Sequence, residues 1–78
     1  MIIQKLNEKT KQFEDYKVSD DWHLPLYSDD MNEVINCVNC GKKIKFGDGY
    51  TSLRYRTIHG FGYCECYDCY EDYYVHKK

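Results

Sequence analysis

Four of the five cysteines stand in two C-x-x-C pairs, Cys37 with Cys40 and Cys66 with Cys69. Two thiolates separated by two residues can both reach one tetrahedral ion at about 2.3 Å, because a tight turn presents their sulfurs on the same side. The 25 residues between the pairs exceed the roughly 15 to 20 of the usual signature, which leaves room for an extra hairpin. The sequence therefore predicts one structural Zn²⁺ ion held by these four cysteines.

A disulfide framework is the main alternative to this metal site. It would need an oxidising compartment and normally an even number of cysteines, whereas this chain has five. Residues 1–3 form the only apolar run near the start, too short for the core of a secretion signal, and no other stretch is apolar enough to span a bilayer. We therefore expect a cytoplasmic protein with reduced thiols and no membrane contact. A redox pair or an iron centre remains an open alternative to zinc.

Cys64 and His59 are the other candidate ligands. Residues two apart in an extended segment point the same way, so Cys64 could replace Cys66. We prefer Cys66 because it keeps the C-x-x-C turn, and this leaves Cys64 as a buried small hydrophobe or a thiol beside the site. His59 could replace a cysteine, but a histidine between turn glycines is more often exposed.

The residues around the cysteines predict the elements that position them. Gly41 follows the first pair, where a positive φ would turn backbone amides toward the sulfurs, as in a zinc knuckle. Polar and apolar residues alternate over 42–46 and again over 50–56, on either side of a glycine turn at 47–49, which predicts a β-hairpin. Residues 66–78 are expected to begin a helix, whose positive end would favour the second pair of thiolates.

We expect residues 1–33 to form a helical and acidic arm that packs on a zinc domain formed by residues 34–78. Five apolar residues near the start recur at close to helical spacing and predict a helix over residues 2–16: Ile2, Ile3, Leu6, Phe13 and Tyr16. Residues 18–33 are expected to be an irregular acidic connector that folds back over the domain. Trp22 should anchor this connector.

A knuckle, a hairpin and then two ligands at a helix N-terminus is the order of elements in treble-clef zinc fingers. The predicted fold is thus a small, zinc-stabilised α+β domain of treble-clef type. Over about residues 37–78 the chain also resembles the GATA-type zinc finger, in C-V-N-C-G at 37–41, T-S-L-R-Y-R at 51–56, a glycine turn at 60–62, C-Y-D-C at 66–69 and the aromatic-rich 70–78. The resemblance implies a zinc finger fold and a role in transcription, although the chain has only two lysines where that family has a basic tail. LIM-like and other treble clefs fit the same order of elements.

The motifs do not indicate catalysis. Catalytic zinc keeps an open coordination position, whereas sites with four cysteines are closed and structural. Protease, deaminase and phosphate-loop motifs are missing from the sequence, so we expect neither enzyme activity nor a small-molecule substrate. The formal charge of −2 gives no strong attraction for nucleic acid.

Two binding functions remain. In the first, which we favour, the chain is a small zinc-binding interaction module that acts as an adaptor or inhibitor of a larger protein machine, such as a polymerase. Its contacts would include Trp22, Asp20, Asp21, Asp29 and Asp30. In the second, basic hairpin residues grip phosphates while tyrosines stack on bases. These residues would be Lys42, Lys43, Lys45, Arg54 and Arg56, with Tyr50 and Tyr55.

Overall fold

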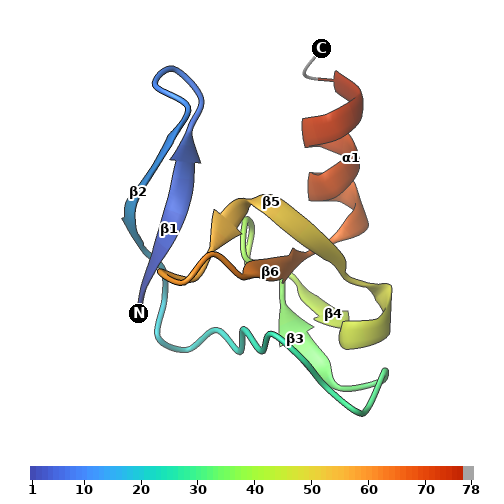
Figure 1. Ribbon diagram of the computed structural model, residues 1–78. Coiled ribbons are helices and arrows are strands. Elements are labelled where there is room, and N and C mark those ends of the chain that lie inside the picture. Colours follow the sequence, from blue (N-terminus) through green and yellow to red (C-terminus); the bar gives the residue numbers. More distant parts are fainter. Residues whose placement is uncertain (77–78) are drawn as a thin grey trace.

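The computed structural model describes residues 1–76. Along this part of the chain, six strands, one short 3-10 helix and one α-helix follow one another (Figure 1). Their bounds are β1 Ile2–Asn7, β2 Gln12–Lys17, β3 Val34–Asn36, β4 Lys43–Lys45, η1 Phe46–Asp48, β5 Tyr50–Arg56, β6 Gly62–Glu65 and α1 Tyr67–His76. The strands form two antiparallel sheets, one in the order β2-β1-β5-β6 and one of β3 with β4. The protein is therefore a small α+β protein.

The N-terminal segment is a β-hairpin, so the predicted helix over residues 2–16 is wrong. Strands β1 and β2 pair in register from Ile2↔Lys17 onwards. The turn between them occupies the gap in the apolar pattern: the Asn7 side-chain oxygen accepts a 2.9 Å hydrogen bond from the Lys9 N–H, and Lys11 has a φ of 61°. An asparagine that bonds the backbone two residues ahead favours such a turn over a helix. The apolar residues of 2–16 belong to two paired strands, and their spacing along the sequence matches that of a helix only by coincidence.

Strand β1 connects the N-terminal hairpin to the rest of the protein. It lies between β2 and β5, with Gln4 opposite Arg56 and Lys5 opposite Tyr55. The buried core is assembled from both halves of the chain: Ile3, Val18, Val38, Tyr55 and Tyr63. Because Ile3 and Val18 supply part of this core, the N-terminal segment is integral to the fold.

Strands β4 and β5 do not pair with each other, so the predicted hairpin of residues 42–46 with 50–56 is also wrong. Ile44 of β4 lies opposite Ile35 of β3, while β5 pairs with β1 and β6. The intervening residues form η1, whose Gly47 N–H donates to the Met31 carbonyl over 2.8 Å. This bond to the connector turns the chain away from β4 instead of folding it back beside that strand.

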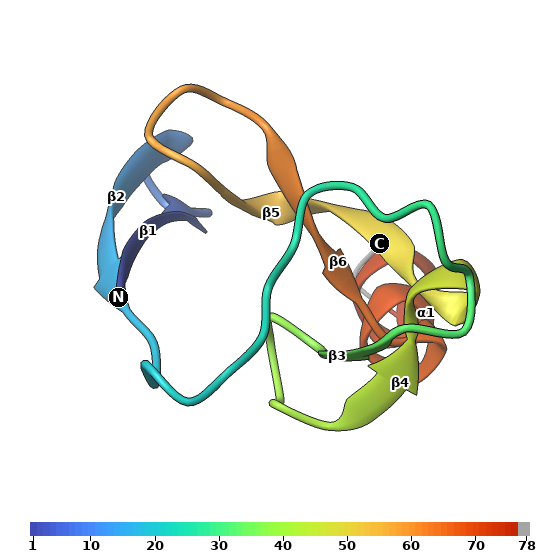
Figure 2. The same ribbon diagram turned by 90° about the horizontal axis from the view of Figure 1, so that it is seen from below.

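The connector between β2 and β3 is irregular, as predicted. In the view from below it crosses in front of the strands (Figure 2). Trp22 is half-buried and packs against the core cluster, as the sequence predicts. Asn36 of β3 ties the same segment down, because its side-chain oxygen accepts a 2.7 Å hydrogen bond from the His23 N–H.

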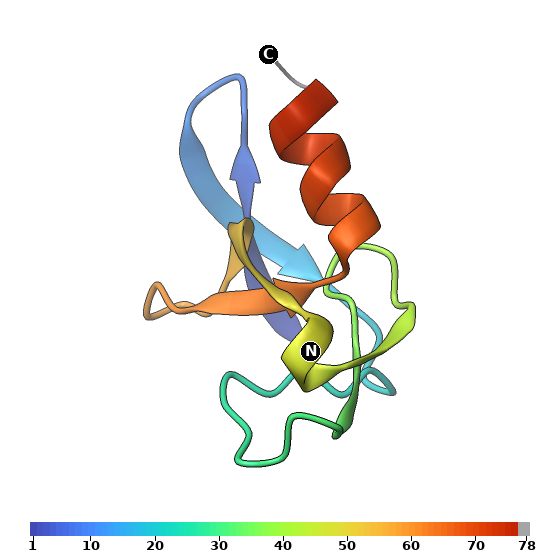
Figure 3. The same cartoon turned by 90° about the vertical axis from the view of Figure 1, so that its right-hand side faces the viewer.

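Helix α1 begins immediately after Cys66, and the Tyr70 N–H donates to the Cys66 carbonyl over 3.0 Å. The helix predicted from residue 66 is confirmed as far as His76, while Lys77 and Lys78 lie outside the described residues. Helix α1 and the β1–β2 hairpin rise on the same side of the molecule (Figures 1 and 3). Within residues 1–76, a helix long and apolar enough to cross a membrane does not occur.

Candidate metal centre

The side chains of Cys37, Cys40, Cys66 and Cys69 converge, and their four sulfur atoms all lie within 4.8 Å of one another. A tetrahedral zinc ion with Zn–S bonds of about 2.3 Å needs sulfurs about 3.8 Å apart. The Cys40 and Cys66 sulfurs are separated by 3.9 Å. The cluster therefore has the composition and the size of a four-thiolate zinc site.

The first pair is positioned by the turn that joins β3 to β4. The Gly41 N–H donates to the Cys37 carbonyl over 2.8 Å, and the Cys37 N–H donates to the Lys42 carbonyl over 2.8 Å. Gly41 has the positive φ that the sequence predicts, at 79°. A residue with a Cβ adopts this conformation at a cost, so glycine allows the turn to close with both sulfurs on one side.

The surroundings of the Cys37 sulfur lower the pKa of its thiol. Burial acts to raise the pKa of Cys37, but hydrogen bonds to its sulfur from three backbone N–H groups and from the Cys40 thiol together lower it. The three N–H groups belong to Cys66, Cys40 and Asn39. A thiolate is the form that coordinates zinc.

Two other sulfurs in the cluster hold their protons more tightly. Burial raises the pKa of the Cys40 thiol, and it raises the pKa of the Cys69 thiol further. An incoming cation must displace these protons, which couples metal binding to proton release.

An asparagine and a tyrosine support the second pair. The Asn39 side-chain N–H donates to the Cys69 sulfur over 3.2 Å, and the Tyr55 hydroxyl donates to the Asn39 side-chain oxygen over 2.6 Å. Tyr55 is 2% exposed, and burial raises its pKa to about 12. Sequence reasoning missed this role, although Asn39 occupies the position of the asparagine in C-x-N-C-G.

A buried ion pair lies directly behind the cluster. An Arg54 terminal nitrogen donates to the Glu65 carboxylate over 3.1 Å and to the Cys69 carbonyl over 3.3 Å. Glu65 is 0% exposed. Burial raises its pKa, against the opposing effects of Arg54 and the Ser52 hydroxyl. Arg54 therefore links β5, the end of β6 and the first turn of α1.

The residues predicted to grip nucleic acid do not form one stripe. Lys43 and Lys45 are exposed on β4, whereas Arg54 and Tyr55 have the internal partners just described. Arg56 lies 3.5 Å from the centre of the Phe13 ring. The remaining two also have neighbours: Lys42 pairs with Asp68 over 3.6 Å, and Tyr50 stacks on Tyr70. Nucleic-acid binding by these residues stays a prediction.

The residues predicted to contact a protein partner lie along the connector. Trp22 faces the core, and the four aspartates are exposed: Asp20, Asp21, Asp29 and Asp30. Asp20 pairs with the amino group of Met1. Asp29 accepts a 2.8 Å hydrogen bond from the Tyr27 hydroxyl. Their role in partner binding also stays a prediction.

Cys64 and His59 lie outside the four-sulfur cluster. Cys64 is half-buried in β6 and lies against Gly49, and burial raises the pKa of its thiol. His59 is exposed in the turn between β5 and β6. The geometry thus brings together the four cysteines of the two C-x-x-C pairs.

The chain matches no known protein-family profile, no curated protein and no solved structure. These comparisons therefore give no support to the GATA-type resemblance. The fold and the cluster define a small α+β protein with four cysteines placed to hold a metal ion.

Proposed function

We propose that this chain is a structural-zinc module of the treble-clef type that binds a protein partner. The arrangement of the four sulfurs carries the proposal, because it joins the β3–β4 turn to the start of α1. The β5–β6 hairpin lies between these elements along the chain, which gives the treble-clef order of knuckle, hairpin and helix. We expect the cytoplasm as its compartment, since the site requires reduced thiols.

The donor set favours zinc in a structural role. Soft thiolates arranged tetrahedrally suit Zn²⁺, and four of them fill its coordination shell, so no position remains for a water or substrate. The role we propose is therefore binding and not catalysis.

Zinc would also stabilise the fold. A core in a chain of this size rarely supplies more than ~3 to 5 kcal/mol, whereas structural zinc sites bind with ~10 to 16 kcal/mol. The ion would hold together two segments that are distant in sequence, the β3–β4 turn and α1. We expect the partner-binding surface to depend on the bound metal for this reason.

A protein partner fits the observed surface better than a nucleic acid. Arg54 and Tyr55, which the nucleic-acid alternative needs, are held inside the protein. The β5–β6 hairpin instead exposes three large apolar side chains, those of Leu53, Ile58 and Phe61. Exposed apolar groups mark a protein interaction surface where they form one contiguous patch. An adaptor or an inhibitor of a larger machine would use such a surface.

Matched cysteine variants test the zinc site. Elemental analysis of protein purified under reducing conditions should give one zinc per chain, and a chelator should abolish the folded circular dichroism spectrum. Cys40→Ser should lower zinc affinity on the order of 100-fold or more, because each ligand contributes about a quarter of the binding free energy. Cys64→Ser should keep full zinc content. Metal-free protein with an unchanged spectrum, or equal zinc loss in both variants, would refute the proposal.

A further inference from the structure

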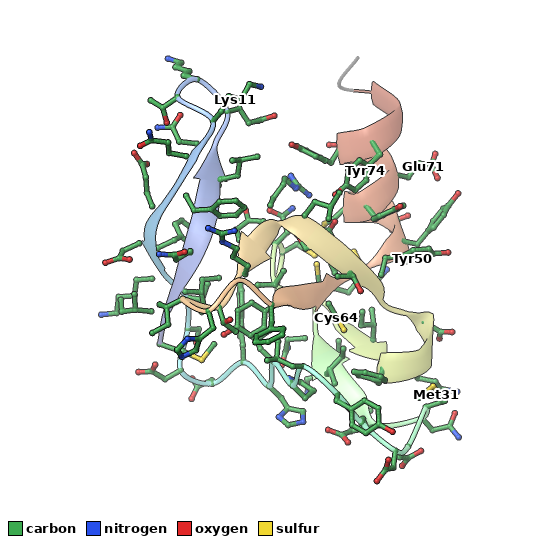
Figure 4. The ribbon with its side chains drawn as sticks, in the orientation of Figure 1. Lys11, Met31, Tyr50, Cys64, Glu71 and Tyr74 are labelled. Carbon is green, nitrogen blue, oxygen red and sulfur yellow. The ribbon has the colours of Figure 1, made fainter. Side chains whose placement is uncertain are left out.

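Four tyrosines form a continuous ladder along one side of α1. Tyr67, Tyr70 and Tyr74 follow one another at helical spacing, and Tyr50 of β5 adds a fourth ring. The centres of the Tyr50 and Tyr70 rings are 4.7 Å apart at an interplanar angle of 23°. Tyr67 lies 5.6 Å from Tyr50 and Tyr74 lies 4.4 Å from Tyr70. Figure 4 shows Tyr50 at the foot of α1 and Tyr74 further along the helix.

This tyrosine ladder is not part of the buried core cluster. Tyr50 is 40% exposed and Tyr67 is 54% exposed. The ladder continues into Leu53, which is 65% exposed and whose N–H donates to the Tyr74 hydroxyl over 3.1 Å. Aromatic side chains that are held in place by one another yet remain open to solvent are typical of binding surfaces.

The charges beside the ladder are acidic. Among the side chains of residues 67–74, the charged ones are Asp68, Glu71 and Asp72. Viewed down the helix axis, these three acidic residues come next to Tyr67 and all lie on the same side of the ladder. Glu71 lies one helical turn after Tyr67 on α1, so its carboxylate is a neighbour of the Tyr67 side chain. Lys42 pairs with Asp68 over 3.6 Å, but both side chains are exposed, and such pairs exchange readily with other partners.

We propose that the tyrosine ladder and its row of carboxylates bind an extended, arginine-rich segment of a partner protein. The inference rests on the proposed function and specifies its partner. A guanidinium group can stack on an exposed tyrosine ring while it forms two hydrogen bonds with a neighbouring carboxylate. The exposed rings of Tyr50 and Tyr67 supply the ring faces, and Glu71 and Asp68 supply the carboxylates.

Charge complementarity favours an arginine-rich segment over a phosphate-bearing partner. Phosphate groups would be repelled by the acidic row, and the Arg54 guanidinium, 4.2 Å from the Tyr73 ring, is already paired with Glu65. A lysine stacks and forms paired hydrogen bonds less well than arginine, because its ammonium is a compact, strongly hydrated charge. The surface should therefore prefer arginine over lysine at equal net charge.

Fluorescence anisotropy with the zinc-loaded full chain tests the proposal. The probes are three labelled peptides of equal length that alternate glycine with arginine, lysine or glutamate, and a single-stranded oligonucleotide. The arginine peptide should bind tightest. Tyr67→Ala and the charge reversal Glu71→Lys should each weaken its binding at least about fivefold, as interface hot spots do. Tyr27→Ala should have no effect, since Tyr27 is an equally solvent-accessible tyrosine in the connector at 75% exposure.

Several outcomes would overturn the proposal. Equal affinity for the lysine and arginine peptides would mean that charge alone drives binding. Oligonucleotide binding that depends on Tyr67, or a Tyr67-dependent dimer in sedimentation, would assign the ladder to nucleic acid or to a second copy of the chain. Loss of binding in Tyr27→Ala would mean that the peptide does not bind specifically at the ladder. Zinc content, measured in every sample, separates the two proposals: absent peptide binding with full zinc refutes only the ladder, whereas absent zinc refutes the module itself.

Discussion

The Tyr55 hydroxyl donates a 2.6 Å hydrogen bond to the side-chain oxygen of Asn39. This bond orients the Asn39 amide so that its N–H group faces the Cys69 sulfur, 3.2 Å away. A group on β5 thereby directs a hydrogen-bond donor at a candidate metal ligand on α1. Groups that orient ligands in this way usually change metal affinity by 10- to 100-fold when they are removed.

Replacing the Tyr55 hydroxyl should weaken zinc binding without unfolding the protein. In Tyr55→Phe the ring still fills the core, but Asn39 loses the partner that holds its orientation. We expect zinc affinity to fall about 10-fold, measured by competition with a chromophoric chelator. Tyr63→Phe is the matched control, because Tyr63 belongs to the same core cluster. If both variants lose affinity equally, the hydrogen bond to Asn39 does not tune the site.

Zinc binding should weaken steeply as the pH falls. Burial raises the pKa of Cys40 and Cys69 in the metal-free protein, so both thiols are protonated at neutral pH and must release their protons when the ion binds. Lower pH favours the protonated thiols, and affinity should fall at least about 100-fold per pH unit. Calorimetry in buffers of different ionisation enthalpy would count the protons. Release of fewer than two protons per ion at pH 7 would contradict the prediction.

Adding a methyl group at Gly41 should lower the free energy of unfolding, because the Trp22 ring packs against this glycine. A Cβ at Gly41 would lie 2.5 Å from a Trp22 ring carbon, and Gly41 also has a positive φ. Gly60 has a positive φ of 93°, and an added Cβ would meet only the end of the Arg56 side chain at 4.0 Å, an ordinary contact, so Gly60→Ala should cost only the backbone strain of about 1 to 2 kcal/mol. Gly41→Ala should lower the free energy of unfolding by a further ~1 to 3 kcal/mol. Denaturant unfolding of both variants gives the difference, and equal losses would mean that Trp22 moves aside freely.

Removing one partner of the Arg54–Glu65 pair should cost more than removing both. Arg54→Met leaves the Glu65 carboxylate buried without its cation, which should lower the free energy of unfolding by about 3 to 5 kcal/mol. The double variant Arg54→Met with Glu65→Leu removes both charges and should recover most of this loss. Chemical denaturation of the unsubstituted protein, Arg54→Met and the double variant gives the comparison. A double variant as unstable as Arg54→Met would show that the charge pair itself, and not an unpaired carboxylate, is what matters.

The candidate site could be predicted because its signals are local. Two cysteines separated by two residues, with Gly41 behind the first pair, specify a tight turn whatever the rest of the chain does. The start of α1 is local as well, since it depends on the residues from Cys66 onwards. These features are confirmed: the four sulfurs converge, and α1 begins beside the second pair.

Strand pairing could not be predicted, because it depends on partners far away in the sequence. Residues 2–16 carry apolar groups at a spacing that suits a helix or a hairpin; the turn at Asn7 favours the hairpin, and β1 then pairs with the distant strand β5. Strands β4 and β5 were identified as strands, but their partners are β3, β1 and β6. Alternation shows that a segment is extended and does not show which strand it lies beside.

The sequence by itself determined the two C-x-x-C pairs as the candidate metal ligands, the turn at Gly41 and the helix that follows Cys66, since each depends on neighbours a few residues away. Only the tertiary structure decided that Arg54 and Tyr55 point inward, to Glu65 and Asn39. An arginine or a tyrosine in a strand has the same appearance in the sequence whether it meets water or a buried partner. Burial arises when distant segments pack, and that packing turned two expected contact residues into supports of the metal site.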